Sequence, residues 1–169
     1  MTANPAADPA RDPGRAIADD SHYELDQIAG FAVFRITRAR RLNALTLPAL
    51  VGLERCVDEL SAGDGRGLIV TGAGDRAFCA GADLAEMRTL TDEQMLDKSR
   101  RARELFHRIQ RARFVSVAAI NGLALGGGLE LALACTFRVA VAQATFGLPE
   151  IKLGVLPAYG GTQFLPPVV

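Results

Sequence analysis

The chain has 169 residues, a length that suits one domain or a large fragment of one and is enough to bury a core. Its 19 basic and 19 acidic residues give a formal net charge of zero, which leaves no overall field to attract nucleic acid. No apolar run approaches the length that spans a membrane, so the composition indicates a globular protein with neither nucleic acid nor membrane as a partner.

The first twenty residues are rich in Ala, Pro and Asp and show no apolar periodicity. They lack the apolar centre of a secretory signal, and their acidic residues are atypical of a transit peptide. We therefore predict a disordered tail over residues 1–20 and a folded core domain over residues 21–169.

A hairpin, a helix and a buried strand are predicted for the N-terminal half. Apolar and polar residues alternate on both sides of Ala29-Gly30, Thr46 is suited to cap a helix, and a short apolar run ends at Gly72. The predicted segments are hairpin strands over 23–25 and 31–36, an arginine-rich loop over 38–41, a helix from Thr46 to the glycines of 63–67, and a strand over 67–72.

Two helices and two more buried strands are predicted for the rest of the chain, from helical spacing and from short apolar runs. The predicted segments are a loop over 78–83, a helix over 92–113 with an arginine-rich outer face, a buried strand over 115–120, a helix over 129–135, a buried strand over 137–141 and a turn over 146–150. This alternation is typical of an α/β fold with a largely buried sheet.

The cysteines and histidines do not form a recognisable site. Cys56, Cys79 and Cys135 have apolar neighbours and no C-x-x-C spacing, so we interpret them as buried thiols in a reducing compartment. His22 and His107 are isolated, which argues against a zinc site and against a Ser-His-Asp triad. Acid–base chemistry is therefore expected to rest on carboxylates.

Three consecutive glycines, Gly126, Gly127 and Gly128, precede an apolar helix. They are either a tight, closely packed turn, or a place where a ligand oxygen approaches backbone N–H groups at a helix N-terminus. The spacing is not G-x-G-x-x-G and no Lys-Ser/Thr follows, so a nucleotide-phosphate loop is not predicted. The loop over 78–83 is either an ordinary loop or a second source of N–H groups, including that of Ala82.

Two glutamates lie in apolar surroundings. Glu130 is in the first turn of the helix after the glycines, where it either complements the helix dipole or is a buried carboxylate that pairs, has a raised pKa or points into a cavity. Glu150 follows Pro149 and is either an acid on a surface turn or a second functional carboxylate. Two carboxylates with different pKa values suit base and acid catalysis, and two N–H groups suit an enolate-like thioester oxygen.

Five sequence motifs, in this order along the chain, resemble the enoyl-CoA hydratase/isomerase (crotonase) family. They are LNAL at 42–45, AFCAGADL at 77–84, NGLALGGGLELA at 121–132, FGLPEIKLG at 146–154 and GGTQ at 160–163. The resemblance extends from about residue 22 to the last residue. It implies an α/β fold built as a spiral of ββα units.

The same resemblance implies roles for individual residues. The N–H groups of Ala82 and Gly127 are expected to form an oxyanion hole, Glu130 to position and activate water, and Glu150 to exchange a proton with the α-carbon. The arginines near 38–41 are expected to approach the CoA phosphates. The residues expected to bind the substrate or CoA are Arg41, Ala44, Ala80, Gly81, Ala82, Asp83, Leu84, Ala85, Gly126 and Gly127.

The sequence departs from the family pattern at several structural positions. Ala39 and Val115 stand where the family usually has proline, Thr136 replaces an aspartate, and Phe164 and Pro167 stand where arginines are usual. Family members also continue beyond this point into helices that close over the acyl chain and make trimer contacts. We therefore expect a C-terminally incomplete domain that exposes apolar surface.

The resemblance leaves three functions open. The first is an enoyl-CoA hydratase, which adds water syn to a 2-enoyl-CoA to give a 3-hydroxyacyl-CoA in fatty-acid or related catabolism. The second is an enoyl-CoA isomerase or another enolate-forming acyl-CoA lyase. The third is an inactive remnant that at most binds CoA or associates with full-length relatives.

Further expectations concern the cofactor, the assembly and the location of the protein. CoA is expected as part of the substrate, with no separate cofactor and no metal. A homotrimer or a dimer of trimers is expected for a full-length relative. The arginine-rich composition, which indicates a GC-rich genome, and the absence of paired cysteines favour a bacterial cytoplasm.

Overall fold

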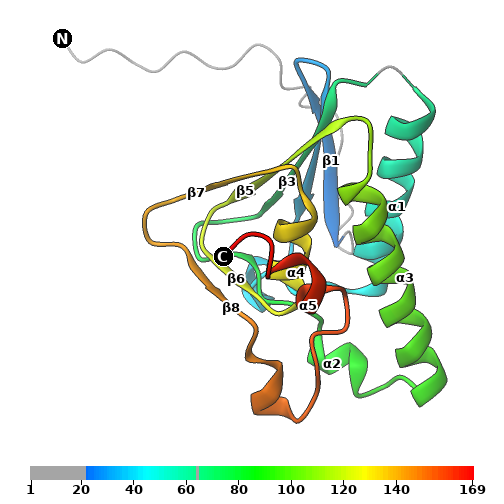
Figure 1. Cartoon of the computed structure of the whole chain (residues 1–169), viewed down its shortest axis with the longest axis vertical. Coiled ribbons are helices and arrows are strands. Elements are labelled where there is room, and N and C mark those ends of the chain that lie inside the picture. Colours follow the sequence, from blue (N-terminus) through cyan, green and yellow to red (C-terminus); the bar gives the residue numbers. More distant parts are fainter. Residues whose placement is uncertain (1–21, 64) are drawn as a thin grey trace.

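The computed structural model describes residues 22–63 and 65–169 (Figure 1). The tail predicted over residues 1–20 lies outside the described residues. Two helices stand along one side of a five-stranded sheet, and a smaller sheet and a short central helix lie beside them (Figure 1). The predicted α/β class is confirmed.

The larger sheet has the strand order β1-β2-β3-β5-β7. Its strands are β1 (Tyr23–Ile28), β2 (Phe31–Ile36), β3 (Gly67–Gly72), β5 (Val115–Ile120) and β7 (Phe137–Ala140). The first two strands form the predicted antiparallel hairpin, and the others pair in parallel. Ala29 and Gly30 both have positive φ, 50° and 81°, which suits the tight turn of a two-residue hairpin.

The smaller sheet consists of three parallel strands in the order β4-β6-β8. They are β4 (Ala77–Cys79), β6 (Leu123–Leu125) and β8 (Thr145–Gly147), each of three residues. The loop predicted over 78–83 and the turn predicted over 146–150 are therefore partly wrong, since each begins with a strand. Strands this short show no periodicity, and only pairing with distant segments defines them.

Two long helices cover the sheet on one side. Helix α1 (Leu47–Ala62) packs on β2 and β3, and Thr46 caps it by accepting a hydrogen bond from the Ala49 N–H, as predicted. Helix α3 (Asp92–Gln110) packs against α1 and begins with a capping box at Thr91. It ends three residues before the predicted 113, where the chain turns into β5.

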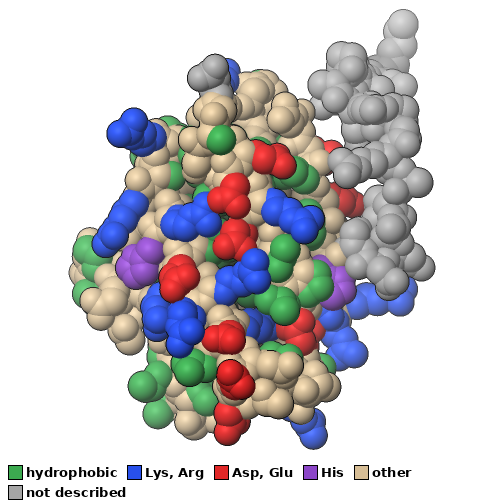
Figure 2. Space-filling model, turned by 90° about the vertical axis from the view of Figure 1, so that its right-hand side faces the viewer, with side chains coloured by type: hydrophobic (Ala, Val, Ile, Leu, Met, Phe, Trp, Pro, Cys, Tyr) green, Lys and Arg blue, Asp and Glu red, His purple; other side chains and the backbone are tan. Residues whose placement is uncertain are grey.

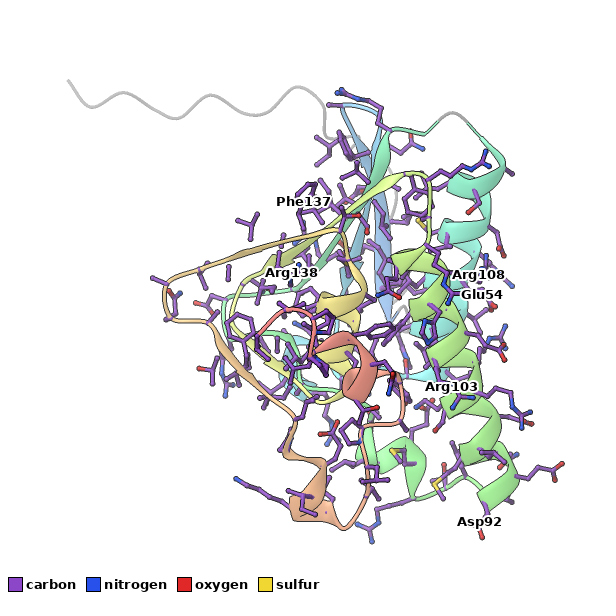
Figure 3. The ribbon with its side chains drawn as sticks, viewed as in Figure 1. Glu54, Asp92, Arg103, Arg108, Phe137 and Arg138 are labelled. Atoms are coloured by element: carbon purple, nitrogen blue, oxygen red, sulfur yellow. The ribbon has the colours of Figure 1, made fainter. Side chains whose placement is uncertain are left out.

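The outer face of α1 and α3 carries basic and acidic side chains interspersed (Figure 2). Ion pairs join the two helices there. Arg101 pairs with Glu54 and Arg108 pairs with Asp58. Arg108 also pairs with Glu54, and both residues are labelled in Figure 3. The arginine-rich face predicted for α3 is thus partly neutralised by acids of α1. Exposed pairs of this kind contribute only about 0–1 kcal/mol each, so they orient the helices more than they stabilise them.

Helix α4 (Gly127–Ala134) lies at the centre, and all eight of its residues are buried. It begins two residues earlier than predicted, so that Gly127 and Gly128 belong to its first turn. It packs on β4, β5 and β6 and against α3. Four short helical segments complete the chain: η1 (Ala39–Arg41), α2 (Leu84–Met87), η2 (Pro149–Leu153) and α5 (Gly161–Phe164).

Strand β7 corrects the prediction of a third buried strand over 137–141. The strand is present, but Phe137 and Val139 are 57% and 64% exposed. It lies at the edge of the larger sheet, paired with β5 alone (Figure 1), and no other described element covers these side chains. On its other face, the Arg138 guanidinium donates to the Cys135 carbonyl at 2.7 Å and so caps the end of α4.

The expectation of exposed apolar surface is confirmed near the C-terminal part of the chain. It comes from β7, β8, η2 and the residues that follow them. The large exposed side chains there are Phe137, Val139, Val141, Phe146, Ile151, Leu153, Val155 and Leu156. Exposed apolar surface of this kind, where it is contiguous, marks interaction sites. Among the described residues, no helix is long and apolar enough to cross a membrane.

Candidate active site

Glu130 is a buried carboxylate held by backbone amides. It lies in the first turn of α4 and is 1% exposed. Its Oε1 accepts hydrogen bonds from the N–H of Tyr159 at 2.9 Å and from that of Gly161 at 2.7 Å. A Cβ on Gly161 would stand 3.0 Å from this same oxygen, so glycine is what lets the segment approach. Dipole complementation alone does not describe a carboxylate fixed in this way.

Burial raises the pKa of the Glu130 carboxyl. The hydrogen bonds from Gly161 and Tyr159 act in the opposite direction because they favour the charged form. The nearby charge of Glu150 raises the pKa further, and the net shift is upward. A raised pKa, one of the alternatives predicted for this buried carboxylate, is confirmed, and the charge of Glu150 contributes to it.

Glu150 has a different environment. It is in η2, directly after Pro149, and is half-buried, not a fully exposed acid on a surface turn. Its Oε2 is buried and has no hydrogen-bond partner among the described residues. Its Oε1 faces Gly126, where a Cβ would come within 3.0 Å of that oxygen. Gly126 has φ 51° and ψ −128°, a conformation that only glycine adopts readily.

Two backbone amides from separate segments meet beside these carboxylates. Ala82 pairs with Leu45 as an isolated parallel bridge, and Gly127 begins α4. A Cβ on Gly81 would stand 3.2 Å from the Gly127 nitrogen, and one on Gly127 would stand 3.6 Å from the Ala82 nitrogen. Neither N–H donates to another described residue. The structure therefore places two free donors together at a helix N-terminus.

The three glycines predicted to matter have different functions. A Cβ on Gly128 would lie 2.1 Å from the Cys79 carbonyl oxygen, so this glycine allows α4 to pack tightly on β4. The close-packing interpretation holds for Gly128. By contrast, Gly126 faces Glu150, and Gly127 faces the ring of Tyr159, whose Cδ2 and Cε2 would be 2.8 Å from a Cβ there.

Tyr159 was not among the predicted site residues. It is 5% exposed, it packs edge-to-face on Phe106 with ring centroids 5.8 Å apart, and it lies against Gly127. Burial raises the pKa of its phenol, and the charge of Glu130 acts in the same direction. The only sequence signal was a single aromatic residue beside Gly160 and Gly161, which periodicity cannot interpret.

The predicted substrate-binding segment 80–85 lies beside the amide pair. Arg38 forms an ion pair with the Asp83 carboxylate and donates to the Ala44 carbonyl at 3.2 Å. Asp83 also caps α2 by accepting from the N–H groups of Ala85 and Glu86. Burial would raise the pKa of Asp83, but the hydrogen bonds and the Arg38 charge outweigh it and hold the pKa below its usual range.

The remaining residues predicted to bind the substrate or CoA make fewer contacts with other residues through their side chains. Arg41, Leu84 and Ala85 are exposed, and the Arg41 side chain makes no ion pair with another described residue. The Ala80 N–H donates to the Leu42 carbonyl at 3.0 Å, which ties segment 80–85 to the arginine-rich turn η1.

The cysteines are internal, as predicted. Burial raises the pKa of Cys56 to about 11 and the pKa values of Cys79 and Cys135 to about 12, so all three stay protonated at neutral pH. Among the described residues, no group of three or more His, Cys, Asp or Glu side chains is placed to hold a metal ion. Two surface hollows, of about 760 and 440 Å³, are lined mainly by α1, α3 and the segments next to them, and neither glutamate of the site lines them.

Known proteins resemble this chain in both sequence and fold. The sequence model of a family described as enoyl-CoA hydratase/isomerase matches residues 26–169. The chain is 39% identical over 146 residues to the crotonyl-CoA hydratase of Syntrophomonas wolfei, and 37% identical over 142 residues to the short-chain-enoyl-CoA hydratase of Clostridium acetobutylicum. The fold matches a crystal structure of an enoyl-CoA hydratase from Bacillus anthracis with a TM-score of 0.83 and 37% identity.

These matches cover most of this chain and part of each relative. They cover 86%, 83% and 88% of this chain, but only 56%, 54% and 58% of the respective relatives. The chain thus spans about half the length of the curated relatives it matches. The structural match confirms the spiral fold that the sequence motifs implied.

Proposed function

This chain belongs to the enoyl-CoA hydratase/isomerase family, and from that premise we propose that its site adds water to the double bond of a 2-enoyl-CoA. The product is the 3-hydroxyacyl-CoA. One observation carries the proposal. Glu130, whose carboxylate is fixed by two backbone amides, and Glu150, which has a carboxylate oxygen without a hydrogen-bond partner, lie beside two backbone N–H groups that donate to no other described residue.

In the proposed reaction, the thioester oxygen accepts hydrogen bonds from the N–H groups of Ala82 and Gly127. As the double bond is attacked, negative charge moves onto this oxygen, where both donors and the positive end of the α4 dipole stabilise it. The donors are fixed in the fold, so little reorganisation is needed when the charge develops. Donors of this kind are typically worth about 10²–10³ in rate each.

The two glutamates share the proton transfers. Glu130 accepts a proton from water, whose oxygen forms the new bond to C3, and Glu150 delivers a proton to C2 as the enolate collapses. The product gains the hydroxyl of the water at C3 and the Glu150 proton at C2, and the acyl-CoA is neither oxidised nor reduced. The proton left on Glu130 then returns through solvent to Glu150, which resets both carboxyl groups. The amides of Tyr159 and Gly161 hold the Glu130 carboxylate in place, while the unpartnered Oε2 of Glu150 is free to contact substrate.

CoA is part of the substrate in this proposal, and no further cofactor is needed. Segment 80–85 is proposed to run along the pantetheine and adenine, with Ala44 and Gly126 beside it. Exposed Arg41 is the better candidate for the CoA phosphates. Arg38 is a weaker one because its guanidinium already pairs with Asp83.

The test is the loss of enoyl-thioester absorbance when crotonyl-CoA is added to the purified 169-residue chain. Glu130→Gln and Glu150→Gln are each expected to lower kcat by about 10²–10⁴, the usual contribution of a general acid or base. Glu104→Gln is the matched control, because Glu104 is exposed on α3, away from the site. It should leave the rate unchanged.

Two results would redirect the proposal. If a folded, soluble chain does not turn over crotonyl-CoA, the hydratase function is refuted for this chain, and CoA binding measured by calorimetry becomes the question. If Glu130→Gln abolishes hydration but leaves exchange of the C2 proton with solvent deuterium intact, the enolate-forming isomerase alternative is favoured.

We further propose that the protein acts in the bacterial cytoplasm and that a full-length relative assembles as a homotrimer or a dimer of trimers. The exposed apolar side chains of β7, β8 and η2 support an assembly, since they are the kind of surface that partners bury. Light scattering of the same sample tests whether this chain associates through that surface, and a monomer at micromolar concentration would show that it does not.

A further inference from the structure

Lys98 occupies an unexpected position in α3. The buried side of this helix consists of Lys98, Ala102, Leu105, Phe106 and Ile109, a spacing that places all five on one face. Lys98 is 4% exposed, although it is a charged residue on an otherwise apolar face. Burying an ammonium is costly unless it is paired and hydrogen-bonded, so its partners should explain its presence.

The partners of Lys98 come from two other parts of the chain. Its ammonium forms an ion pair with the Glu86 carboxylate, in α2, and donates to the Leu45 carbonyl at 3.3 Å. The same carboxylate accepts the Leu47 N–H at 3.0 and 3.2 Å. The lysine therefore joins α3, α2 and the start of α1 at the backbone of Leu45.

Leu45 in turn holds the segment that carries the Ala82 amide. The Leu45 N–H donates to the Gly81 carbonyl at 2.7 Å, and the Asp83 N–H donates to the Leu45 carbonyl at 2.9 Å. These two hydrogen bonds lie on either side of Ala82 and form the isolated parallel bridge between Leu45 and Ala82. Because successive amides of an extended segment point in opposite directions, the Ala82 N–H points away from Leu45, which leaves it free.

We propose that Lys98 is a positioning residue for the Ala82 N–H, acting through the Leu45 carbonyl, with Glu86 as its counter-ion. The inference rests on the proposed function, in which this N–H binds the thioester oxygen. The Leu45 carbonyl accepts two donors, from Asp83 and from Lys98. Removing the second donor lets the bridge shift, and the direction of the Ala82 N–H shifts with it.

The experiment compares three variants of the full chain. Lys98→Met keeps the length of the side chain and removes its charge. The double variant Lys98→Met/Glu86→Gln removes both charges, so that folding is not lost to an unpaired carboxylate. Arg101→Met is the matched control: Arg101 also belongs to α3 and also pairs with an acid of another element, Glu54, but on the exposed face.

The first readout is the infrared carbonyl band of bound butyryl-CoA, a saturated thioester that cannot be hydrated. In the wild type, two hydrogen bonds should lower its frequency relative to free butyryl-CoA. We expect the band to move back toward the free value in Lys98→Met and in the double variant. We also expect kcat with crotonyl-CoA to fall about tenfold to a hundredfold, with KM within about threefold, since donor misplacement affects the transition state most. Arg101→Met should match the wild type in both.

A purely structural Lys98 would give a different result. Both Lys98 variants would then lose activity only in proportion to the unfolded fraction, with the carbonyl band unmoved, and the inference would be overturned. The Ala82 amide resonance of the free protein separates this inference from the proposed function. If the wild type neither binds nor hydrates acyl-CoA, the proposed function fails. A shift of that resonance in Lys98→Met, absent in Arg101→Met, would still support positioning, and no shift would overturn it.

Discussion

Replacing Gly128 with alanine tests how closely α4 is packed on the smaller sheet. A Cβ at this position would lie 2.1 Å from the Cys79 carbonyl oxygen and 2.7 Å from its carbonyl carbon, both well inside the 3.4 Å at which ordinary contact begins. These are backbone atoms of β4, so no side chain can rotate to make room. The helix or the strand must therefore move by about 1 Å.

The expected cost follows from two opposing effects. Overpacking a well-packed site costs about 1–3 kcal/mol, and a backbone collision belongs at the upper end. Alanine in a helix gains about 1 kcal/mol over glycine. We therefore expect Gly128→Ala to lose about 2 kcal/mol of unfolding free energy, equivalent to roughly 4–8 °C in Tm for a domain of this size.

Urea unfolding followed by circular dichroism measures this loss. Gly147→Ala is the control, because the nearest atom to a Cβ there is Leu125 Cδ2 at 3.5 Å, an ordinary contact. The control should stay within about 0.5 kcal/mol of the wild type. If Gly128→Ala is as stable as the wild type, the gain in helix propensity outweighs the collision. The tight contact between α4 and β4 would then not require glycine at position 128.

Three further predictions concern charge and exposed surface. The folded chain binds the Glu130 proton more tightly than the unfolded chain does, so the free energy of unfolding should fall as pH rises above the ordinary glutamate pKa of about 4.3. Urea unfolding of Glu130→Gln should not show this fall. If the unfolding free energies of variant and wild type differ by the same amount at every pH from 4 to 8, the prediction is wrong. Asp83→Asn leaves Arg38 without its ion-pair partner and should lower the free energy of unfolding by about 1–3 kcal/mol at pH 7. Because the pKa of Asp83 is lowered in the folded chain, the difference in unfolding free energy between variant and wild type should shrink as pH falls below about 3.9. A difference that does not change with pH would exclude the ion pair as its cause. The double variant Phe137→Ser/Val139→Ser should scatter less light than the wild type at high concentration. Its free energy of unfolding should stay within about 1 kcal/mol of the wild-type value. Unchanged association would show that the chains do not associate through β7.

The elements predicted best are those whose signals are local. Thr46 before an apolar helix, and Ala29-Gly30 between alternating runs, each placed an element boundary from a few adjacent residues. The chemistry of Glu130 was also predictable in part, since a carboxylate in an apolar first turn must be paired or have a raised pKa.

What the sequence could not predict depends on distant partners. The three-residue strands β4, β6 and β8 exist because they pair with one another, and nothing within three residues encodes that pairing. Strand β7 contains the apolar residues of a buried strand, but burial depends on what lies over the strand, and no described element covers Phe137 or Val139. Lys98 could not be distinguished from a surface lysine without knowing that Glu86 and Leu45 surround it.

The two glutamates differ in how their carboxylates are hydrogen-bonded, and this difference indicates a function in acid–base chemistry. Glu130 has its Oε1 fixed by two amides from residues 29 and 31 positions further along the chain, so its orientation is set before any ligand arrives. Glu150 has a buried oxygen with no partner among the described residues, a costly arrangement for a group that serves only the fold. An acid–base pair needs this difference, because one carboxyl must hold a reactant while the other exchanges a proton with it. The cost of the unpartnered oxygen is therefore the strongest physical argument that this site is built around a ligand that completes it.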